Sequence, residues 1–307
     1  PDKTVDGKVS TRVRKDRKER IYSKYIDIEE NENGTPISIK FKNTEKFNFA
    51  YDLVDALAEK EPEKLAMLHI SKDMTERRFT FTDMRKLSSQ CANYFASLGI
   101  KKGDRVMLIL KRHYQFWIAM LGLNKLGAIA IPAVDQLQEH DLEYRFESAG
   151  VSAIVCTADG EVARQVDIAA EKCPQLTIKM MVGGTRDGWR NFDEEYKRFS
   201  SHFERTESSP CGNDTMLMYF TSGTTGKSKG VMLTHTSLVD NATCMDMGEP
   251  VGTVTLSVLP IHHAYCFTCD ILAGLCIGST CCFNDSIMRL VKNMNLFNPQ
   301  IILLVPM

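Results

Sequence analysis

The sequence predicts an α/β fold in which mostly parallel sheets are flanked by helices. Between residues 106 and 182, short apolar runs alternate with helical stripes, and this alternation is typical of βαβ units. The chain has 307 residues, 43% of them hydrophobic, which is enough to bury a substantial core in one large domain or two ordinary ones. Its 38 basic and 39 acidic side chains leave a net charge of -1, which removes any general attraction to nucleic acid or anionic membranes.

The ends and the cysteines of the chain indicate where such a protein works. The first residues, Pro1 to Val5, lack the apolar stretch of a secretory signal, so we expect no export. The apolar run Ile271–Ile277 is far shorter than the roughly 20 residues that a membrane-spanning helix needs. The 10 cysteines are scattered through apolar segments, as expected of reduced thiols rather than of a disulfide framework. These features predict a cytoplasmic location.

Residues 1–45 form a charged N-terminal segment that is rich in Lys, Arg and Glu. The basic run Arg12–Arg20 has two interpretations, an arm that binds nucleic acid and a solvated helix or tail. Acidic residues such as Asp27 and Glu29 follow directly and cancel its field. We therefore favour the solvated helix or tail, and expect the packed structure to begin near Phe47.

Residues 46–203 are expected to form a first α/β subdomain. Apolar residues recur at helical spacing from Phe49, and two paired strands follow at Leu65–Ser71 and Arg77–Phe81. Thr82 is the expected N-cap of the next helix, which ends at a glycine. Beyond it, strands are predicted over residues 106–110, 128–131, 151–156 and 178–182, and helices over residues 115–126, 142–149 and 162–169.

The polar segment Glu204–Thr215 carries turn formers and is expected to lead into a second, incomplete subdomain over residues 204–307. The alternation of strands and helices continues there. Strands are predicted over residues 216–220, 231–233, 253–259 and 301–305, and helices from about residue 236 and over residues 287–297.

The most informative segment runs from Thr221 to Gly230 and is called the phosphate loop below; its sequence is Thr-Ser-Gly-Thr-Thr-Gly-Lys-Ser-Lys-Gly. Glycines allow tight turns that expose backbone N–H groups, hydroxyls add further donors, and two lysines add positive charge. A polyphosphate carries negative charge and has only acceptor oxygens, so this composition favours polyphosphate binding over a plain surface loop. The candidate binding residues are Thr221, Ser222, Gly223, Thr224, Thr225, Gly226, Lys227, Ser228 and Lys229.

A second type of phosphate-binding loop competes with this interpretation. Gly226, Lys227 and Ser228 match the end of the Walker A pattern, but that pattern requires a glycine where this chain has Thr221. A Walker loop also opens directly into a helix, whereas residues 231–233, Val-Met-Leu, favour a strand. Both observations argue against an NTPase of the Walker class.

The phosphate loop resembles the phosphate-binding signature of the adenylate-forming superfamily, which includes acyl-CoA synthetases, luciferases and the adenylation domains of peptide synthetases. That signature has an apolar residue before a core rich in hydroxyls and glycine, and a small and a basic residue after it. Met218, Thr221–Gly226, Ser228 and Lys229 match it, although proline is more common at the position of Ser228.

A second segment, Leu259–Tyr265, is similar to a stretch of the same family in which a strand leads to a histidine or aromatic residue beside the acyl chain and the reacting carboxylate. His263 stands at the matching position; the alternative is a histidine with a purely structural role at a strand end. Together with Cys266 and Cys269, the histidines also suggest zinc or redox chemistry. A second spaced pair of ligands is missing, so we expect buried thiols and no metal site.

The resemblance implies a layered αβαβα fold and a reaction in which a carboxylic acid becomes an acyl-adenylate and then an acyl-CoA thioester. ATP, Mg²⁺ and CoA are the implied cofactors and co-substrates, and a medium- or long-chain fatty acid is the implied acid. Lys229 would offset charge on the leaving pyrophosphate and His263 would orient the carboxylate, which makes them the candidate catalytic residues.

The family's adenine- and magnesium-binding motif, its ribose-binding aspartate and its C-terminal catalytic lysine have no counterpart before Met307. We therefore expect the chain to correspond to the first half to three-fifths of such an enzyme and to be inactive alone. The last predicted strand, residues 301–305, would lack neighbours, which predicts poor stability or self-association into a homo-oligomer. A nucleotide- or acyl-binding module without catalysis is the alternative function.

Overall fold

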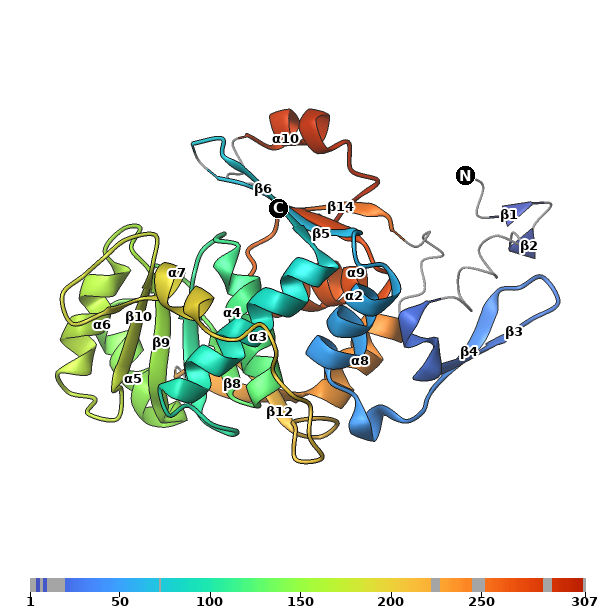
Figure 1. Cartoon of the computed structure of the whole chain (residues 1–307). Coiled ribbons are helices and arrows are strands. Elements are labelled where there is room, and N and C mark those ends of the chain that lie inside the picture. Colours follow the sequence, from blue (N-terminus) through green and yellow to red (C-terminus); the bar gives the residue numbers. More distant parts are fainter. Residues whose placement is uncertain are drawn as a thin grey trace.

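The computed structural model describes residues 4–5, 8–9, 20–71, 73–221, 227–244, 252–283 and 289–305. Its main architecture consists of one sheet of seven strands and one of five (Figure 1). Two antiparallel hairpins accompany them, β1 (Thr4–Val5) with β2 (Lys8–Val9) and β3 (Ile26–Glu30) with β4 (Pro36–Phe41). No helix in these ranges is both long and apolar enough to cross a membrane.

The larger sheet has the strand order β11-β10-β9-β7-β8-β12-β13. Its strands are β7 (Arg105–Ile109), β8 (Ile129–Pro132), β9 (Val151–Thr157), β10 (Ile178–Val182), β11 (Arg190–Asn191), β12 (Thr215–Thr221) and β13 (Lys229–Thr234). Neighbouring strands are parallel except β12 and β13, which form an antiparallel hairpin. The strands predicted over residues 106–182, 216–220 and 231–233 are all found in this sheet.

The smaller sheet has the order β16-β14-β15-β5-β6. Its strands are β5 (Leu65–Ile70), β6 (Glu76–Thr80), β14 (Val254–Ser257), β15 (Thr280–Phe283) and β16 (Ile301–Ile302). Only the hairpin β5–β6 is antiparallel within it. The sequence did not predict β15, and the predicted final strand over residues 301–305 is limited to two residues.

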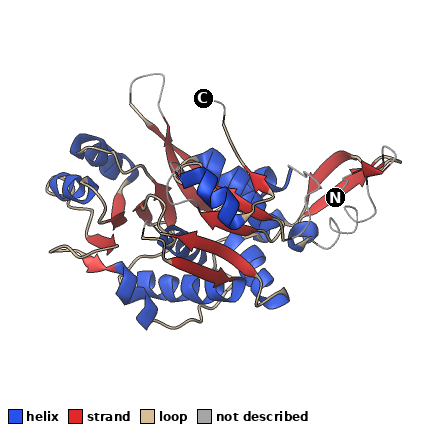
Figure 2. Ribbon diagram, turned by 90° about the horizontal axis from the view of Figure 1, so that it is seen from above, coloured by secondary structure: helices blue, strands red, loops and turns tan. Residues whose placement is uncertain are grey.

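Helices cover both sheets and fill the space between them (Figures 1 and 2). The outer face of the larger sheet carries α5 (Glu139–Ala149) and α6 (Val162–Ala170), and that of the smaller sheet carries α10 (Leu290–Phe297). Between the sheets lie η3 (Ala50–Asp55), α2 (Ala56–Lys60), α3 (Phe81–Ser97), α4 (Gln115–Leu126), α8 (His235–Cys244), η5 (Cys266–Leu272) and α9 (Ala273–Cys276). Short helices are η1 (Ile21–Lys24), η2 (Thr44–Lys46), α7 (Phe192–Glu195) and η4 (Tyr196–Arg198). This is the layered αβαβα fold.

Alternating burial along the strands explains these layers. In β7, Val106 and Leu108 belong to the core between the sheets, whereas Met107 and Ile109 belong to the core under α5 and α6. Successive side chains of a strand point to opposite faces, so an apolar run of this kind needs cover on both sides. In the middle layer α4 is buried along nearly its whole length, as its continuous apolar sequence predicts.

The N-terminus of α3 corrects one prediction. The N-cap is Thr80 rather than Thr82. The Thr80 Oγ1 accepts a hydrogen bond from the Asp83 N–H at 3.1 Å, and the Asp83 carboxylate accepts one from the Thr80 N–H at 2.9 Å. This reciprocal pair is a capping box, which Thr82 has no acidic partner to form.

The structure of the charged N-terminal segment corrects the prediction that packing begins near Phe47. Within residues 1–45, Ile26–Glu30 and Pro36–Phe41 form hairpin β3–β4, which the sequence did not predict. Tyr25 is buried and its ring lies 4.8 Å from that of Phe47, so packing begins before Phe47. Of the basic run Arg12–Arg20, only Arg20 lies among the described residues, and it is buried.

The sheets do not follow the boundary that the sequence predicted at residue 204. Strands β5 and β6 come from the part before that residue, yet β5 pairs with β15 from the part after it. Conversely, β12 and β13 from the later part extend the larger sheet beside β8. Each sheet is therefore completed only by both parts of the chain.

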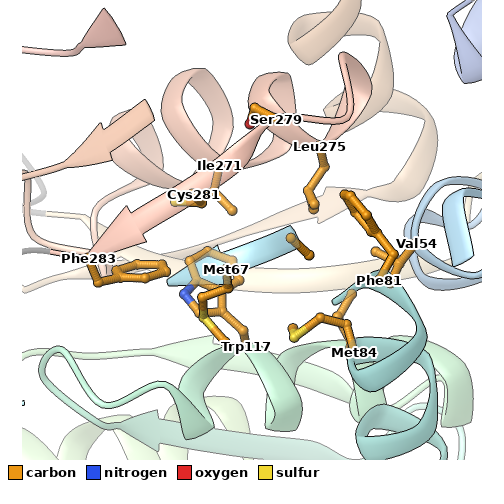
Figure 3. Close-up of a pocket in the computed structure, with 12 residues that line it drawn as sticks. Val54, Met67, Phe81, Met84, Trp117, Ile271, Leu275, Ser279, Cys281 and Phe283 are labelled. Atoms are coloured by element: carbon orange, nitrogen blue, oxygen red, sulfur yellow. The ribbon is translucent and has the colours of Figure 1, made fainter. Parts of the chain in front are cut away.

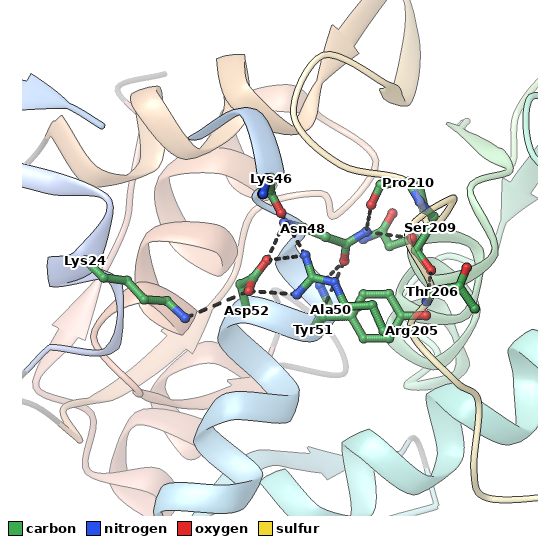
Figure 4. Close-up of polar contacts among 11 residues, drawn as sticks. Lys24, Lys46, Asn48, Ala50, Tyr51, Asp52, Arg205, Thr206, Ser209 and Pro210 are labelled. Carbon is green, nitrogen blue, oxygen red and sulfur yellow. Dashed lines mark hydrogen bonds and ion pairs between the residues drawn. The ribbon is translucent and has the colours of Figure 1, made fainter. Parts of the chain in front are cut away.

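Residues 204–214, which precede β12, lie against the first helices of the chain (Figure 4). The Arg205 guanidinium donates to the two carboxylate oxygens of Asp52 at 2.9 and 3.0 Å, and to the Lys46 carbonyl at 2.7 Å. The Lys24 ammonium lies 3.9 Å from the same carboxylate. Asp52 is buried, so this ion pair is shielded from water on one side.

A second set of contacts continues along the same segment (Figure 4). The Asn48 side-chain amide donates to the Pro210 carbonyl at 2.9 Å, and the Gly212 N–H donates to the Phe47 carbonyl at 2.9 Å. Gly212 has a φ of +55°, and a Cβ at this position would lie 2.2 Å from the Glu45 carbonyl oxygen. This close approach requires glycine and sets the direction in which the chain enters β12.

Candidate active site

The phosphate loop connects β12 to β13, the last two strands in the order of the larger sheet. Thr221 ends β12 and pairs across the hairpin with Lys229, which begins β13. Both residues are exposed, as is Lys227, while Ser228 is half-buried. Ser222, Gly223, Thr224, Thr225 and Gly226 lie outside the described residues. The strand after the loop is the one that the sequence predicted, and it replaces the helix of a Walker loop.

Helix α5 contacts both ends of this loop. The Tyr144 hydroxyl donates to the Ser228 carbonyl at 2.8 Å, and the Lys227 ammonium lies 5.5 Å from the centroid of the Tyr144 ring. On the other side of the hairpin, the Arg145 guanidinium lies 5.1 Å from the centroid of the Phe220 ring. Tyr144 was not predicted from the sequence, because nothing in the local pattern of α5 indicates a partner 84 positions away.

The topology places further polar residues at the same edge as the phosphate loop. Strands β7, β8 and β12 are parallel, so their carboxyl ends meet at one edge of the sheet. The loops that follow β7 and β8 carry Lys111 and Asp135, whose ammonium and carboxylate lie 3.0 Å apart. In α/β proteins, ligands bind outside the carboxyl ends of the strands, so this edge is the candidate active site.

A cleft of about 490 Å³ opens between this edge and the carboxyl end of β14 in the smaller sheet. The larger sheet contributes Lys111 and Asp135, and the smaller sheet contributes residues 258–262. Its remaining lining residues are Arg112, Leu290, Leu304 and Val305. The cleft thus joins a charged wall to an apolar one.

The two histidines of the second predicted segment lie where β14 leads into helix η5. Their rings are 4.6 Å apart; His262 lines the cleft, whereas the His263 side chain is exposed. The His263 carbonyl accepts from the Phe267 N–H at 3.0 Å. Burial, followed by the neighbouring His263, lowers the pKa of His262 to about 4, so it is neutral at pH 7. In the described part of the chain, no hydrogen bond or ring contact joins these histidines to the phosphate loop.

Arg112, which no sequence motif indicated, links the two sheets at this edge. It stands after β7, and its guanidinium donates to the carbonyls of Leu259 at 2.8 Å, of Val258 at 3.4 Å and of Ser257. Arginine is suited to this task because its planar group offers several donors in a fixed geometry. The segment that carries the histidines is therefore held by the loop after β7.

A second cleft, of about 680 Å³, adjoins the first across Lys111 and Arg112. It lies at the carboxyl ends of β5, β7, β9 and β10, and its lining includes the side chains of His69, Arg77 and His113. The His69 Nε2 lies 3.3 Å from the Arg112 carbonyl, and burial lowers the pKa of His69 to about 4. The candidate active site therefore consists of two adjoining clefts between the sheets, together called the groove below, which are lined by both polar and apolar residues.

A small enclosed pocket lies deeper in the layer between the sheets (Figure 3). Trp117 and Phe283 line it from α4 and β15, and Ile271 and Leu275 line it from the helix that follows the histidines. Its volume of about 30 Å³ is much smaller than that of either cleft. The Trp117 ring stacks on Phe267 at a centroid distance of 5.8 Å.

Of the two cysteines near the histidines, Cys266 is buried and Cys269 is half-buried. Burial raises the pKa of Cys266 to about 12, which keeps this thiol protonated and makes it a poor nucleophile or metal ligand. Cys269 lies one helical turn further along and its pKa is also raised by burial. Among the described residues, no group of three or more His, Cys, Asp or Glu side chains is arranged to hold a metal ion.

A model of the AMP-binding enzyme family matches residues 54–307, which is most of the chain. The chain belongs to the AMP-binding enzyme family. The resemblance of the phosphate loop to adenylate-forming enzymes is thereby confirmed at the level of the family.

Curated AMP-binding relatives include acyl-coenzyme A synthetases. The protein named acyl-coenzyme A synthetase ACSM5, mitochondrial, of Rattus norvegicus is 37% identical over 196 residues, which cover 61% of this chain and 33% of that protein. Acyl-coenzyme A synthetase ACSM3, mitochondrial, of Homo sapiens is 34% identical over 200 residues, covering 63% and 33%. This AMP-binding chain therefore spans about a third of the length of these relatives.

Solved structures of similar fold include a CoA ligase bound to an acyl-adenylate. The anthranilate CoA ligase AuaEII in complex with anthranoyl-AMP has a TM-score of 0.75 at 20% identity, covering 84% of this chain and 49% of that one. The N-terminal domain of FACL13 from Mycobacterium tuberculosis has a TM-score of 0.70 at 24% identity, covering 80% and 60%. At these identities the comparison shows a shared fold.

Proposed function

We propose that the whole protein uses ATP to convert a carboxylic acid to an acyl-adenylate and then to a CoA thioester. The observation that carries this proposal is the phosphate loop, which opens at the same sheet edge as the cleft of about 490 Å³. The curated relatives named acyl-coenzyme A synthetases support it. So does the similar fold of the anthranilate CoA ligase in complex with anthranoyl-AMP.

The reaction consists of two displacements. A carboxylate oxygen attacks the α-phosphorus of ATP, and the bond between the α-phosphorus and the bridging oxygen breaks to release pyrophosphate. The CoA thiolate then attacks the acyl carbon, the bond to the AMP oxygen breaks, and the thiol proton goes to solvent. Charge moves onto pyrophosphate and then onto AMP, so positioning and electrostatic stabilisation dominate the catalysis.

The residues of the phosphate loop supply the matching groups. Its backbone N–H groups and hydroxyls would bind the β- and γ-phosphates, and Lys229 at the start of β13 would offset the charge of the leaving pyrophosphate. Mg²⁺ would enter with ATP, since hard cations prefer oxygen ligands of the kind that its phosphates offer.

The cleft suits the acid substrate. His262 lines it in its neutral form, and His263 stands beside it, so their ring nitrogens could orient a carboxylate by hydrogen bonds. The apolar residues Leu290, Leu304 and Val305 favour an acid with an apolar tail. We propose a medium- or long-chain fatty acid as the substrate, with CoA as the acyl acceptor.

The first prediction concerns Lys229. In the whole protein, Lys229→Ala should lower the acid-dependent exchange of pyrophosphate into ATP roughly a hundredfold, because a charge that stabilises the transition state is lost. The exchange is measured with a panel of fatty acids, together with acyl-hydroxamate formation. The thermal midpoint should stay unchanged, because the Lys229 side chain is exposed.

Lys40→Ala is the matched control, since Lys40 is an exposed lysine on hairpin β3–β4. An exchange rate for Lys229→Ala equal to that of Lys40→Ala would refute the role of Lys229. If the whole protein binds ATP or fatty acid but exchanges no pyrophosphate with any acid, the binding module without catalysis is the correct function.

We also propose that the protein works in a reducing compartment. All 10 of its cysteines are free thiols, and most of them are buried. The cytoplasm and the mitochondrial matrix both meet this condition, and the relatives named above carry the word mitochondrial in their names. Fractionation of cells that express the whole protein distinguishes the two locations.

A further inference from the structure

Helix α5 is placed to fix the end of the phosphate loop at Lys227 and Ser228, an inference that rests on the proposed function. The helix leaves from β8, the strand beside β12, and its Leu142 and Phe146 are buried in the core under the larger sheet. Tyr144 and Arg145 stand between these two positions and contact the hairpin β12–β13 instead. The core therefore fixes the helix, and the helix contacts the loop.

Tyr144 contacts the returning end of the phosphate loop, which is the end that leads into β13. Its hydroxyl donates to the carbonyl of Ser228, the residue between the two lysines. Its ring lies beneath the Lys227 ammonium, at 5.5 Å from the ring centroid, and makes an edge contact with Phe220 at 6.5 Å. One side chain thus contacts the strand before the loop, through Phe220, and both a lysine side chain and a backbone carbonyl within the loop.

We propose that Tyr144 is a positioning residue for ATP, which acts by fixing the returning end of the phosphate loop. A loop that binds phosphate through backbone N–H groups must hold those groups in one orientation, and the entropy of ordering a mobile loop is otherwise lost from the binding free energy. The Tyr144 hydrogen bond restrains the Ser228 carbonyl, and with it the peptide that leads to Lys229. Affinity for ATP, rather than for the acid, depends on this bond.

A purely structural role for Tyr144 makes a different prediction. Tyr144 is half-buried and packs beside Phe220, so its loss could lower stability alone. In that case the thermal midpoint would fall while the KM for ATP stayed constant. The two roles are therefore separated by measuring both quantities in the same variants.

The experiment compares Tyr144→Phe with Tyr94→Phe in the whole protein. Both variants lose one hydroxyl that makes a single hydrogen bond, since the Tyr94 hydroxyl donates to the Glu195 carboxylate at 3.0 Å, far from the phosphate loop in sequence. Tyr144→Phe should raise the KM for ATP about three- to tenfold, the range for one hydrogen bond, and leave the KM for the acid unchanged. Tyr94→Phe should leave both KM values unchanged.

Tyr144→Leu, which also removes the ring beneath Lys227, should raise the KM for ATP further. The dissociation constant of ATP, measured by equilibrium dialysis without acid, should follow the same order. Equal ATP affinity for wild type and Tyr144→Phe overturns the inference even if the wild type is fully active. A wild type without pyrophosphate exchange refutes the proposed function instead, and dialysis then still tests Tyr144.

Discussion

His69, His235 and His262 each have a pKa lowered to about 4, and in each case burial is the largest cause. A buried imidazole is more stable in its neutral form, because the protein interior solvates the cation poorly. At pH 7 these rings can therefore exchange hydrogen bonds but carry no charge. At pH 7 none of these three rings supplies a cationic attraction for a carboxylate.

The buried side chain of His235 leads to a prediction about the pH dependence of stability. Its ordinary pKa is 6.5, so between pH 6.5 and about pH 4 the unfolded chain binds a proton that the folded chain excludes. The free energy of unfolding should then fall by roughly 3 kcal/mol across this window and keep its full value above pH 6.5. Urea denaturation at several pH values should show that His235→Gln removes this part of the pH dependence.

His140→Gln is the control, because the His140 side chain is 73% exposed. Its stability curve should run parallel to that of the wild type across the whole window. If the curve of His235→Gln also runs parallel to the wild type, burial of His235 has no energetic effect on titration.

The sequence was informative about single residues only where their types form a dense local pattern. The phosphate loop met this condition, because many donors and two lysines follow one strand. Tyr144 and Arg112 did not, since each acts on backbone carbonyls that lie 84 and 145–147 positions away. Every residue has a backbone carbonyl, so the sequence does not indicate which carbonyl accepts such a hydrogen bond.

At the scale of elements, the segment before β12 depends on one glycine. Gly212 combines a φ of +55° with an approach of 2.2 Å between its missing Cβ and the Glu45 carbonyl oxygen. Gly188 has a φ of +74°, but its missing Cβ would meet nothing within 4 Å. An alanine at Gly188 would therefore cause backbone strain alone, whereas an alanine at Gly212 would cause both backbone strain and steric overlap.

We predict that Gly188→Ala costs roughly 1–2 kcal/mol of unfolding free energy, the typical penalty of a left-handed backbone for an L-residue. Gly212→Ala should cost clearly more, because the backbone must also move away from Glu45. Chemical denaturation of the two variants measures the difference. Equal losses would mean that the segment shifts freely and does not set the path into β12.

The elements themselves were largely predictable, whereas their partners were not. Apolar runs of strand length identified the strands of the larger sheet, because burial on both faces leaves a continuous apolar signal. The hairpin β3–β4 was missed since its charged residues obscured the alternation of Ile26, Ile28, Ile37 and Ile39. The pairing of β5 with β15 places Met67 beside Cys281. These residues are far apart in the sequence, and the hydrophobic pattern of each strand does not indicate which distant strand it pairs with.

At the scale of the whole molecule, each sheet needs strands from both sides of residue 204. A fragment of residues 46–203 would leave β5 and β8 without the partners β15 and β12. β5 would still pair with β6, and β8 with β7, but each would become an edge strand that exposes a row of backbone hydrogen-bonding groups. Because both sheets are shared, we expect the parts before and after residue 204 to fold as one unit.

We predict that fragments 46–203 and 204–307, produced separately, show no cooperative thermal transition, whereas the unbroken chain does. Circular dichroism and calorimetry measure the transitions. A cooperative transition in either fragment alone would show that it has its own complete core, contrary to the shared sheets.

Arg112 has a mechanical consequence for the groove. Its guanidinium extends from the strand end of one sheet to three successive carbonyls at the strand end of the other. Widening the groove would stretch these bonds together, so the two walls resist separation and keep a nearly constant spacing. We therefore expect the groove to select ligands by their shape and thickness more than by adjusting its own width.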